Sequence, residues 1–173
     1  MTVRIELLPV SPVLLQACRD RGWLEDVETN RQMGFGSDGD GIGTAAHHFL
    51  EAADNGMLGI FADSRPVGWL SVEQDGDESA KVTVFVDPAS RRKGIGSEAV
   101  VLSAASLLRD GYRRVGAAVP EINQGARTFF RRCGFKREGK RWSALKIDGR
   151  EYDTEQLVLT QVELTRTGQK PEG

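Results

Sequence analysis

Short apolar runs alternate with stretches of helical periodicity along most of the chain. The runs are rich in β-branched residues and predict strands at Val3–Leu8 (an edge strand), Met57–Ala62, Val67–Val72, Lys81–Val86, Val115–Val119, from Phe135 onward, and at Gln156–Leu164. The segment Ser64–Pro66 lies between the second and third runs and is typical of a turn, so these two runs are expected to form a hairpin.

Helices are predicted where apolar residues recur every three or four positions. Ser11 and Pro12 form a start signal, because a hydroxyl caps the first turn and proline needs no N–H there. Three further helices are expected, each with one apolar face. The first follows a Thr44 cap and has Ala46, Phe49, Leu50 and Ala53 on this face, and the second has Ile95, Ala99, Leu102, Ala105 and Leu108. The third has Ala126, Phe129, Phe130 and Cys133 and ends before Gly134. This order predicts an α/β (α+β) fold with a mixed, mainly antiparallel sheet and helices on both faces.

The chain contains no internal repeat and no interdomain linker, so residues 1–166 are expected to form a single domain, with residues 167–173 as a tail. The glycine-rich stretch from Asn30 to Gly43 has little to bury and predicts a long loop. We expect this loop to form one wall of a binding cleft. Its Asp38 and Asp40 would attract a cation, although acidic residues are also common in turns.

The net charge of −2 argues against a dominant electrostatic surface for nucleic acids. The sequence has no apolar run long enough to span a bilayer and no secretory signal peptide, so a cytoplasmic protein without membrane contacts is expected. Cys18 and Cys133 form no CxxC pair, and neither a disulfide framework nor a metal site is expected. His47 and His48 are helical neighbours that project about a quarter-turn apart, which disfavours a shared metal ion.

The segment Val82–Gly96 has the pattern best suited to chemistry. A strand ends at Asp87-Pro88, and a basic loop with Gly94 and Gly96 leads directly into a helix. Such a loop lets backbone N–H groups approach a pyrophosphate at the positive end of the helix dipole. It matches neither the GxxxxGK[ST] phosphate loop nor the GxGxxG dinucleotide fingerprint.

The same segment, VDPASRRKGIGSEAV, resembles the acyl-CoA-binding signature of GNAT N-acetyltransferases, with Arg91, Gly94 and Gly96 in its Arg-x-x-Gly-x-Gly positions. The second signature of that family follows as NQGARTFFRRCGF, with Asn-x-x-Ala and then Gly-Phe. The stretch KREGKRWSALKIDGREYD is similar to the RimJ/RimL-like branch, which contains ribosomal-protein N-terminal acetyltransferases. The resemblance covers the chain after Asn55 and implies the GNAT fold, in which two central strands splay apart around the cofactor.

The resemblance implies acetyl-CoA as a co-substrate. Backbone groups of Val84, Phe85 and Val86 would pair with the pantetheine arm, and the amides from Arg92 to Ser97 would hold the pyrophosphate. Asn123 would contact the pantetheine or line its channel, and it can also cap the following helix. The implied cofactor-binding residues are Val84, Phe85, Val86, Arg91, Arg92, Lys93, Gly94, Ile95, Gly96, Ser97, Asn123 and Phe130.

Direct acetyl transfer to an amine needs a proton acceptor for the amine, a polarised carbonyl and a proton for the departing thiolate. The family's tyrosine acid corresponds to Phe130, and its two usual glutamate bases correspond to Lys81 and Ala118, none of which suits these roles. The replacements we consider are Glu73 and Tyr152 first, followed by Glu121 and Asp153. Each of these is also interpretable as a solvated charge or a turn residue.

The sequence therefore favours an acetyl-CoA-dependent N-acetyltransferase whose acceptor is a small-molecule amine or a protein N-terminus. The alternative is a catalytically weak acyl-CoA-binding regulatory module, supported by the missing tyrosine and glutamates. A weaker hypothesis is nucleic-acid binding through Arg127, Arg131, Arg132, Lys136 and Arg137. Cys133 is expected to be a buried structural thiol rather than a nucleophile. The oligomeric state is left open, with a homodimer among the options.

Overall fold

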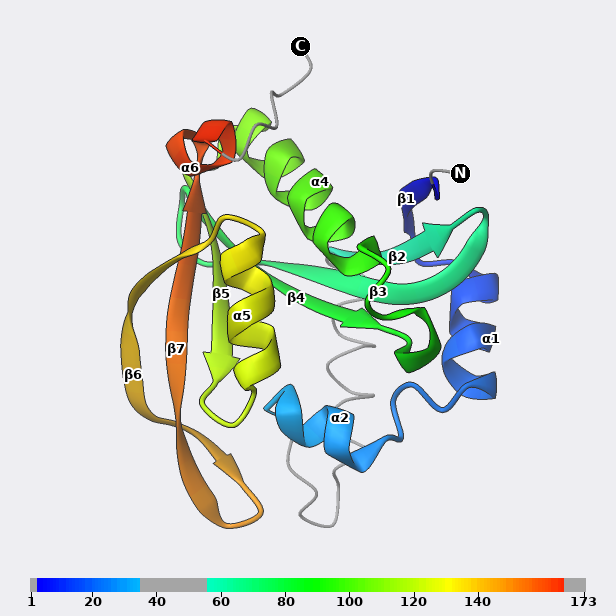
Figure 1. Cartoon of the computed structure of the whole chain (residues 1–173), viewed down its shortest axis with the longest axis horizontal. Coiled ribbons are helices and arrows are strands. Elements are labelled where there is room, and N and C mark those ends of the chain that lie inside the picture. The colour runs from blue at the N-terminus through cyan, green and yellow to red at the C-terminus, as the bar shows by residue number, and fades with distance from the viewer. Residues whose placement is uncertain (1–2, 35–55, 167–173) are drawn as a thin grey trace.

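A computed structural model of the protein describes residues 3–34 and 56–166. Within these residues, seven strands form one sheet in the order β1-β2-β3-β4-β5-β7-β6. The strands are β1 (Ile5–Pro9), β2 (Met57–Ala62), β3 (Arg65–Gln74), β4 (Ser79–Val86), β5 (Arg114–Pro120), β6 (Lys136–Ile147) and β7 (Arg150–Thr160). Every neighbouring pair is antiparallel except β4 and β5, which run parallel. The predicted mixed, mainly antiparallel sheet is confirmed, and β1 lies at its edge (Figure 1).

The helices begin at the capping residues that the sequence offers. The described helices are α1 (Pro12–Asp20), α2 (Val27–Gln32), α4 (Ile95–Arg109), α5 (Gln124–Arg132) and α6 (Gln161–Arg166), with a 3-10 turn, η1, at Pro88–Ser90. Ser11 Oγ accepts a hydrogen bond from the Leu14 amide at 3.4 Å, which confirms the predicted start of α1. None of the helices in the described ranges is long and apolar enough to cross a membrane.

The β2–β3 hairpin turns at Asp63 and Ser64, so the predicted turn at Ser64–Pro66 is wrong by one residue. Asp63 and Ser64 have φ values of 48° and 64°, the paired positive values of a two-residue turn that matches the twist of the strands. Arg65 and Pro66 already belong to β3. Pro66 lies beside Phe61, next to the register shift of the hairpin, where a residue without an N–H is tolerated.

The predicted loop from Asn30 onward is wrong at its start, because Asn30 to Gln32 lie in α2. The side chain of Asp26 caps this helix by accepting a hydrogen bond from the Thr29 amide at 2.6 Å, and this bond lowers the pKa of Asp26. Asn30 is buried, and its side-chain amide donates to the carbonyl oxygen of Leu24 at 2.9 Å. The remainder of the predicted loop beyond Gly34, and the helix predicted after Thr44, lie outside the described residues.

Two apolar stretches pack differently from their sequence prediction. Leu102 of α4 was expected on the buried face but is 45% exposed. The buried stripe of α4 instead advances in steps of four, through Ile95, Ala99 and Ser103, and so turns away from Leu102. The predicted last strand ends at Thr160, and Gln161–Arg166 form α6 with Leu164 fully buried.

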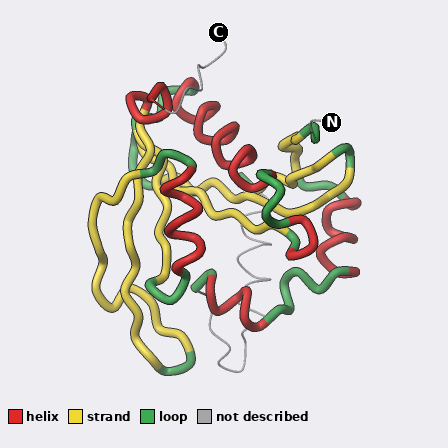
Figure 2. The backbone as a smooth tube through the Cα atoms, in the orientation of Figure 1, coloured by secondary structure: helices red, strands yellow, loops and turns green. Residues whose placement is uncertain are grey.

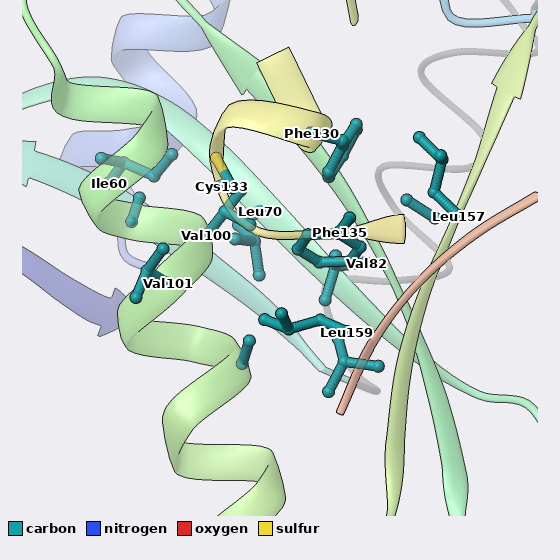
Figure 3. Packing of buried hydrophobic residues seen from close by; sticks show 14 of the residues in the cluster. Ile60, Leu70, Val82, Val100, Val101, Phe130, Cys133, Phe135, Leu157 and Leu159 are labelled. Atoms are coloured by element: carbon teal, nitrogen blue, oxygen red, sulfur yellow. The ribbon is translucent and has the colours of Figure 1, made fainter. Parts of the chain in front are cut away.

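Helices cover both faces of the sheet, as predicted (Figure 2). On one face α4, α5 and α6 pack on a core that includes Leu70, Val82, Val100, Phe130, Phe135, Leu157 and Leu159 (Figure 3). On the opposite face α1 packs on an aromatic cluster in which Trp69 and Phe85 stack at 5.8 Å and Trp23 meets Phe85 at 5.5 Å. We call these the α4 face and the α1 face.

A carboxylate on β7 holds α5 against the sheet. Glu155 is 7% exposed and meets Arg127 at 3.4 Å, Arg137 at 3.9 Å and Arg131 directly. Burial would raise the pKa of Glu155, but the hydrogen bonds and charges of Arg131 and Arg127 outweigh it and lower that pKa. Three of the five basic side chains considered for nucleic-acid binding are thus engaged by this carboxylate, and Lys136 pairs with Glu163 at 3.1 Å.

Replacing this carboxylate should destabilise the fold in a pH-dependent way. We expect Glu155→Gln to lower the free energy of unfolding by about 1.5–3 kcal/mol near pH 7, because charged hydrogen bonds are lost. A lowered folded-state pKa stabilises the protein above the unfolded value of about 4.3, and that stabilisation disappears as the pH falls through the folded value. The gap between wild type and variant, measured by urea denaturation, should therefore shrink below about pH 4.

The matched control is Glu78→Gln, which breaks the exposed Arg113–Glu78 pair. Exposed pairs contribute about 0.5 kcal/mol or less, so this variant should unfold at nearly the wild-type urea concentration. Equal effects of the two variants at pH 7 would show that Glu155 has no special role.

Candidate active site

The central feature of the site is the divergence of β4 from β5, and we call the opening between their facing backbone edges the groove. The two strands pair only from Ser79 to Lys81 on β4 and from Arg114 to Gly116 on β5. Beyond this three-residue ladder they diverge (Figure 1). From Val82 onward the edge of β4 that would face β5 pairs with none of the described strands, while its other edge stays paired with β3 up to Val86. The predicted splayed strand pair is therefore present.

Of the three residues expected to pair with a pantetheine arm, Val84 and Val86 present their backbone groups to this open edge, whereas the carbonyl of Phe85 faces Gly68 of β3. Val84 and Val86 pack against the core on the α4 face, and Phe85 is buried on the α1 face. Their side chains are thus fixed by packing, which holds the backbone of β4 in place at the groove. The carbonyl oxygen of Val86 accepts a hydrogen bond from Arg91 Nε at 2.8 Å, and the Arg91 guanidinium lies 5.8 Å from the Phe85 ring centre.

The loop after β4 has the backbone shape of an anion-binding nest. Arg92 has φ of 61° and Gly94 has φ of 80°, so left-handed residues alternate with right-handed or extended ones just before α4. Such alternation turns successive N–H groups toward one point. Gly94 is the N-cap of the 15-residue helix α4 and has no side chain that could accept the N–H groups of the first turn. The amides predicted to hold a pyrophosphate, from Arg92 to Ser97, lie in this loop and in the first turn of α4, and their contact with a pyrophosphate stays a prediction.

The residues that follow Arg92 fix the conformation of this loop and of the start of α4. Lys93 Nζ donates to the Ala89 carbonyl at 3.2 Å, which tightens the turn that precedes α4. Ile95 is buried at 5% exposure and anchors the start of α4 in the core. Gly96 lies close to Val86 and Phe129, where an added Cβ would approach their side chains to 3.2 and 3.3 Å.

Asn123 caps α5 at the other side of the groove. Its Oδ1 accepts a hydrogen bond from the Ala126 amide at 2.9 Å, and its Nδ2 donates to the Gln32 carbonyl at 3.1 Å. The capping interpretation is confirmed, and its contact with a cofactor stays a prediction. The second bond ties the C-terminal end of α2 to α5, so that α2 lies across the opening between the diverging strands (Figure 1).

Phe130, which stands at the family's tyrosine position, is 6% exposed and belongs to the core of the α4 face. It packs edge-to-face against Phe129 and Phe135 with both ring centres 5.1 Å away. Figure 3 shows its ring among the core residues near Phe135 and Leu157. A buried aromatic ring without a hydroxyl is suited to shaping the channel wall and not to proton transfer.

The two candidate proton-transfer residues lie on the α1 face, on opposite sides of the groove. Strand alternation places Glu73 on this face because its neighbour Val72 packs on the α4 face. Glu73 is paired in register with Lys81, the residue at one of the family's glutamate positions. On β7, Tyr152 accepts a hydrogen bond from Arg31 of α2 at 3.4 Å. The register puts Glu73 level with Val158 of β7, six residues along that strand from Tyr152, so the structure does not bring these two side chains together.

Glu121 and Asp153 have structural roles instead. Glu121 Oε1 accepts a hydrogen bond from the Asp153 amide at 3.1 Å, which joins the end of β5 to β7. Asp153 accepts the Ser143 amide at 2.8 Å and pairs with Lys140 at 2.5 Å. The hydrogen bond from Lys140 holds the pKa of Asp153 below its usual range.

Neither cysteine has the environment of a nucleophile. Cys133 is 3% exposed, and burial raises its pKa, although a hydrogen bond with Ser97 acts in the opposite direction. Burial likewise raises the pKa of Cys18 to about 11. Across residues 3–34 and 56–166 no group of three or more potential metal ligands occurs. His47, His48, Asp38 and Asp40 lie outside those ranges.

Sequence reasoning missed a charged cavity at the closed end of the groove. Lys81 pairs with Asp75 at 3.0 Å and Arg114 pairs with Glu138, and all four side chains line a cavity of about 100 Å³. The hairpin spacing between β3 and β4 indicates that Asp75 and Lys81 lie near each other. The contribution of Glu138, in contrast, depends on the register of β6 and β7, which no local pattern specifies.

Comparison with known proteins identifies relatives of this arrangement. Residues 18–135 match the model of the acetyltransferase (GNAT) family. A probable GNAT-family acetyltransferase from Chromobacterium violaceum is 21% identical, with a TM-score of 0.78 and with 95% of this chain and 87% of that chain covered. RimJ from Mycobacterium smegmatis, solved with CoA-disulfide, is 20% identical, with a TM-score of 0.71 and coverage of 94% and 87%.

A third structural neighbour is RimL, a ribosomal L7/L12 alpha-N-protein acetyltransferase solved with coenzyme A. It is 17% identical, with a TM-score of 0.68 and with 92% of this chain and 95% of that chain covered. A search of curated proteins found no significant match. At these identities the structural likeness shows the shared fold, and the family match over residues 18–135 covers most of the groove.

The nest can be tested by adding a side chain to it. We expect Gly94→Val to raise the dissociation constant of CoA at least tenfold, about 1.4 kcal/mol, as measured by isothermal titration calorimetry. An added Cβ at Gly94 has no protein atom within 4 Å, so a loss of affinity would come from the backbone conformation and from the ligand itself.

Gly111→Val provides the matched control, because Gly111 also has a positive φ, 105°, and no neighbour within 4 Å of an added Cβ. It follows the end of α4 that is farther from the nest and should bind CoA like the wild type. A folded Gly94→Val variant with unchanged affinity would place the pyrophosphate elsewhere.

Proposed function

Because the chain belongs to the acetyltransferase (GNAT) family, we propose that it transfers an acetyl group from acetyl-CoA directly to a primary amine. The observation that carries this proposal is the short ladder between β4 and β5. It leaves a backbone edge open from Val82, and this edge leads straight to the nest at Arg92–Gly94.

The described residues offer partners for two parts of a CoA thioester, the pantetheine arm and the pyrophosphate. The open edge of β4 offers N–H and C=O groups to the two amides of a pantetheine arm, as a neighbouring strand would. The nest and the start of α4 offer N–H groups and the positive end of a helix dipole to a pyrophosphate. Arg91 and Arg92 add positive charge beside that position. When bound, acetyl-CoA supplies the activated acetyl group, and the protein supplies its placement.

The proton transfers fall to residues on the α1 face. An amine that is protonated near neutral pH must lose a proton before its nitrogen attacks the thioester carbon. We assign Glu73 as the acceptor of this proton, directly or through water, since β3 is a rigid element beside the groove. Backbone N–H groups of β4 would polarise the carbonyl. The departing thiolate would take up the proton that Glu73 removed from the amine, directly or through water.

The acceptor is a small-molecule amine or a protein N-terminus. One structural neighbour, RimL, is an alpha-N-protein acetyltransferase, which supports the second of these. We place the protein in the cytoplasm, since both cysteines are free thiols, as is usual in a reducing compartment.

Turnover with a panel of amines tests the proposed function. The full-length chain is incubated with acetyl-CoA and single amines or short peptides, and thiol release and the acetylated product are both quantified. We expect amine-dependent thiol release in equal amount to acetylated product. Tight CoA binding without turnover on any amine would instead support a catalytically weak acyl-CoA-binding module, which the phenylalanine at position 130 and the lysine at position 81 favour.

Removing the proposed base should slow transfer and spare cofactor binding. Glu73→Gln is expected to lower kcat/KM by a factor of about 10² or more and to leave the dissociation constant of CoA unchanged. It should also shift or remove the acidic limb of the pH–rate profile. Glu78→Gln, the same change at the exposed pair with Arg113, serves as the control and should keep the wild-type profile. A Glu73→Gln variant with wild-type rates at every pH would exclude Glu73 as the base.

A further inference from the structure

The charged cavity lies at the point where the groove opens. Lys81 and Gly116 form the last pair of the parallel β4–β5 ladder, and both line the cavity. The remaining lining residues come from the turn after β3 and from β4, β5, β6 and β7: Asp75, Ser79, Ala80, Arg114, Ala117, Glu138, Gln156, Leu157 and Val158. A molecule whose reacting amine lies in the groove beside Val82 therefore has this cavity as its immediate neighbour.

The cavity and the two candidate proton-transfer residues share one face of the sheet. Val115 and Ala117 of β5 pack on the α4 face, so Gly116 between them faces the α1 face. Lys81 lies on the same face, because Val82 beside it packs on the α4 face. Glu73 is the direct cross-strand partner of Lys81. The cavity thus adjoins the acceptor side of the groove.

The cations of the cavity have more N–H donors than their protein partners use. Lys81 has three donors and meets Asp75, while Arg114 has five donors and meets Glu138. Lys81 is also the less exposed member of its pair, at 30% against 50% for Asp75. Both cations line the cavity together with their partners Asp75 and Glu138, so an anion that enters it would meet charged donors on two strands.

The volume limits what can enter. Pockets that enclose whole small molecules measure roughly 300–1,000 Å³. A cavity of about 100 Å³ holds only one functional group with its adjoining carbon atoms. A carboxylate fits both the size and the donors.

We propose that this cavity binds a carboxylate of the acceptor, with Lys81 and Arg114 as its cationic partners. This rests on the proposed N-acetyltransferase function and narrows its substrate to amines that carry a carboxylate a few bonds from the nitrogen. A free amino acid supplies such a group as its α-carboxylate. A peptide that begins with an acidic residue supplies it as a side chain. The lysine at a position where relatives use a glutamate base is then a specificity residue.

The test compares acceptors that differ only in this carboxylate. One pair is alanine and alaninamide, and the other is the peptide amides Asp-Ala and Asn-Ala. We expect one of the two pairs to show a preference, with kcat/KM at least tenfold higher for the acceptor that carries the carboxylate than for its amide. The pair that shows the preference identifies the source. Equal kcat/KM values within both pairs would overturn the proposal and leave the acetyltransferase function standing.

Two variants test whether the preference for the carboxylate acceptor depends on the cavity. Lys81→Met removes one cation and should reduce the preference at least tenfold. Gly116→Val fills the cavity, and its Cβ would lie 3.6 Å from Leu157 O and Lys81 Cγ, an ordinary contact that the strand tolerates. It should reduce the preference in the same way while the dissociation constant of CoA stays at the wild-type value.

Gly139→Val is the control for the second variant, because an added Cβ at Gly139 on β6 has no atom within 4 Å and Gly139 does not line the cavity. It should keep the wild-type preference. If Lys81→Met and Gly116→Val also keep it, the carboxylate binds elsewhere and the proposal fails. If no amine is acetylated by the wild type under any condition, the proposed function falls first and this inference falls with it.

Discussion

The site depends on the short hydrogen-bonded ladder between β4 and β5. β4 keeps β3 as a partner along its whole length, and β5 keeps β7, so each strand has one satisfied edge. Their shared ladder ends after three residues, at Lys81 and Gly116. Backbone N–H and C=O groups left in such a gap need partners, and a ligand with its own amides can supply them. The unpaired edge of the sheet is therefore the proposed binding position of the pantetheine arm.

The rest of the structure holds this gap open. The aromatic cluster on the α1 face and the aliphatic core on the α4 face fix the side chains of β4 on both sides. At the other strand, Glu155 draws three arginines of α5 and β6 onto β7, and Asn123 links α5 to the end of α2. A movement of β5 toward β4 would disturb these contacts. The groove is thus a consequence of packing at a distance from it.

The strands and the loop that form the groove were predictable, because the sequence patterns that indicate them are local. The alternation of β-branched residues located β4, and the glycines after Asp87 located the nest and the start of α4. The two signatures gave the family, which the match over residues 18–135 confirms. Features that depend on pairing were not predictable. The turn at Asp63–Ser64, the exposure of Leu102 and the helical end at Gln161–Arg166 follow from twist, helix crossing and the end of the β5–β7 ladder. The cavity of Lys81, Arg114 and Glu138 required the register of four strands at once.

The residue proposed for proton transfer differs from those at the family's usual positions. Glu73 of β3 is the carboxylate proposed as the base, whereas the family's usual positions hold Lys81, Ala118 and Phe130. A crystal structure of the full-length chain with acetyl-CoA tests most directly whether the groove is the cofactor site. We expect the pantetheine arm beside the open edge at Val82–Val86, the pyrophosphate at the amides of Arg92–Ser97, and the acetyl group on the side of Glu73. Acetyl-CoA bound elsewhere, with the edge of β4 left unpaired, would contradict the proposed function of the groove.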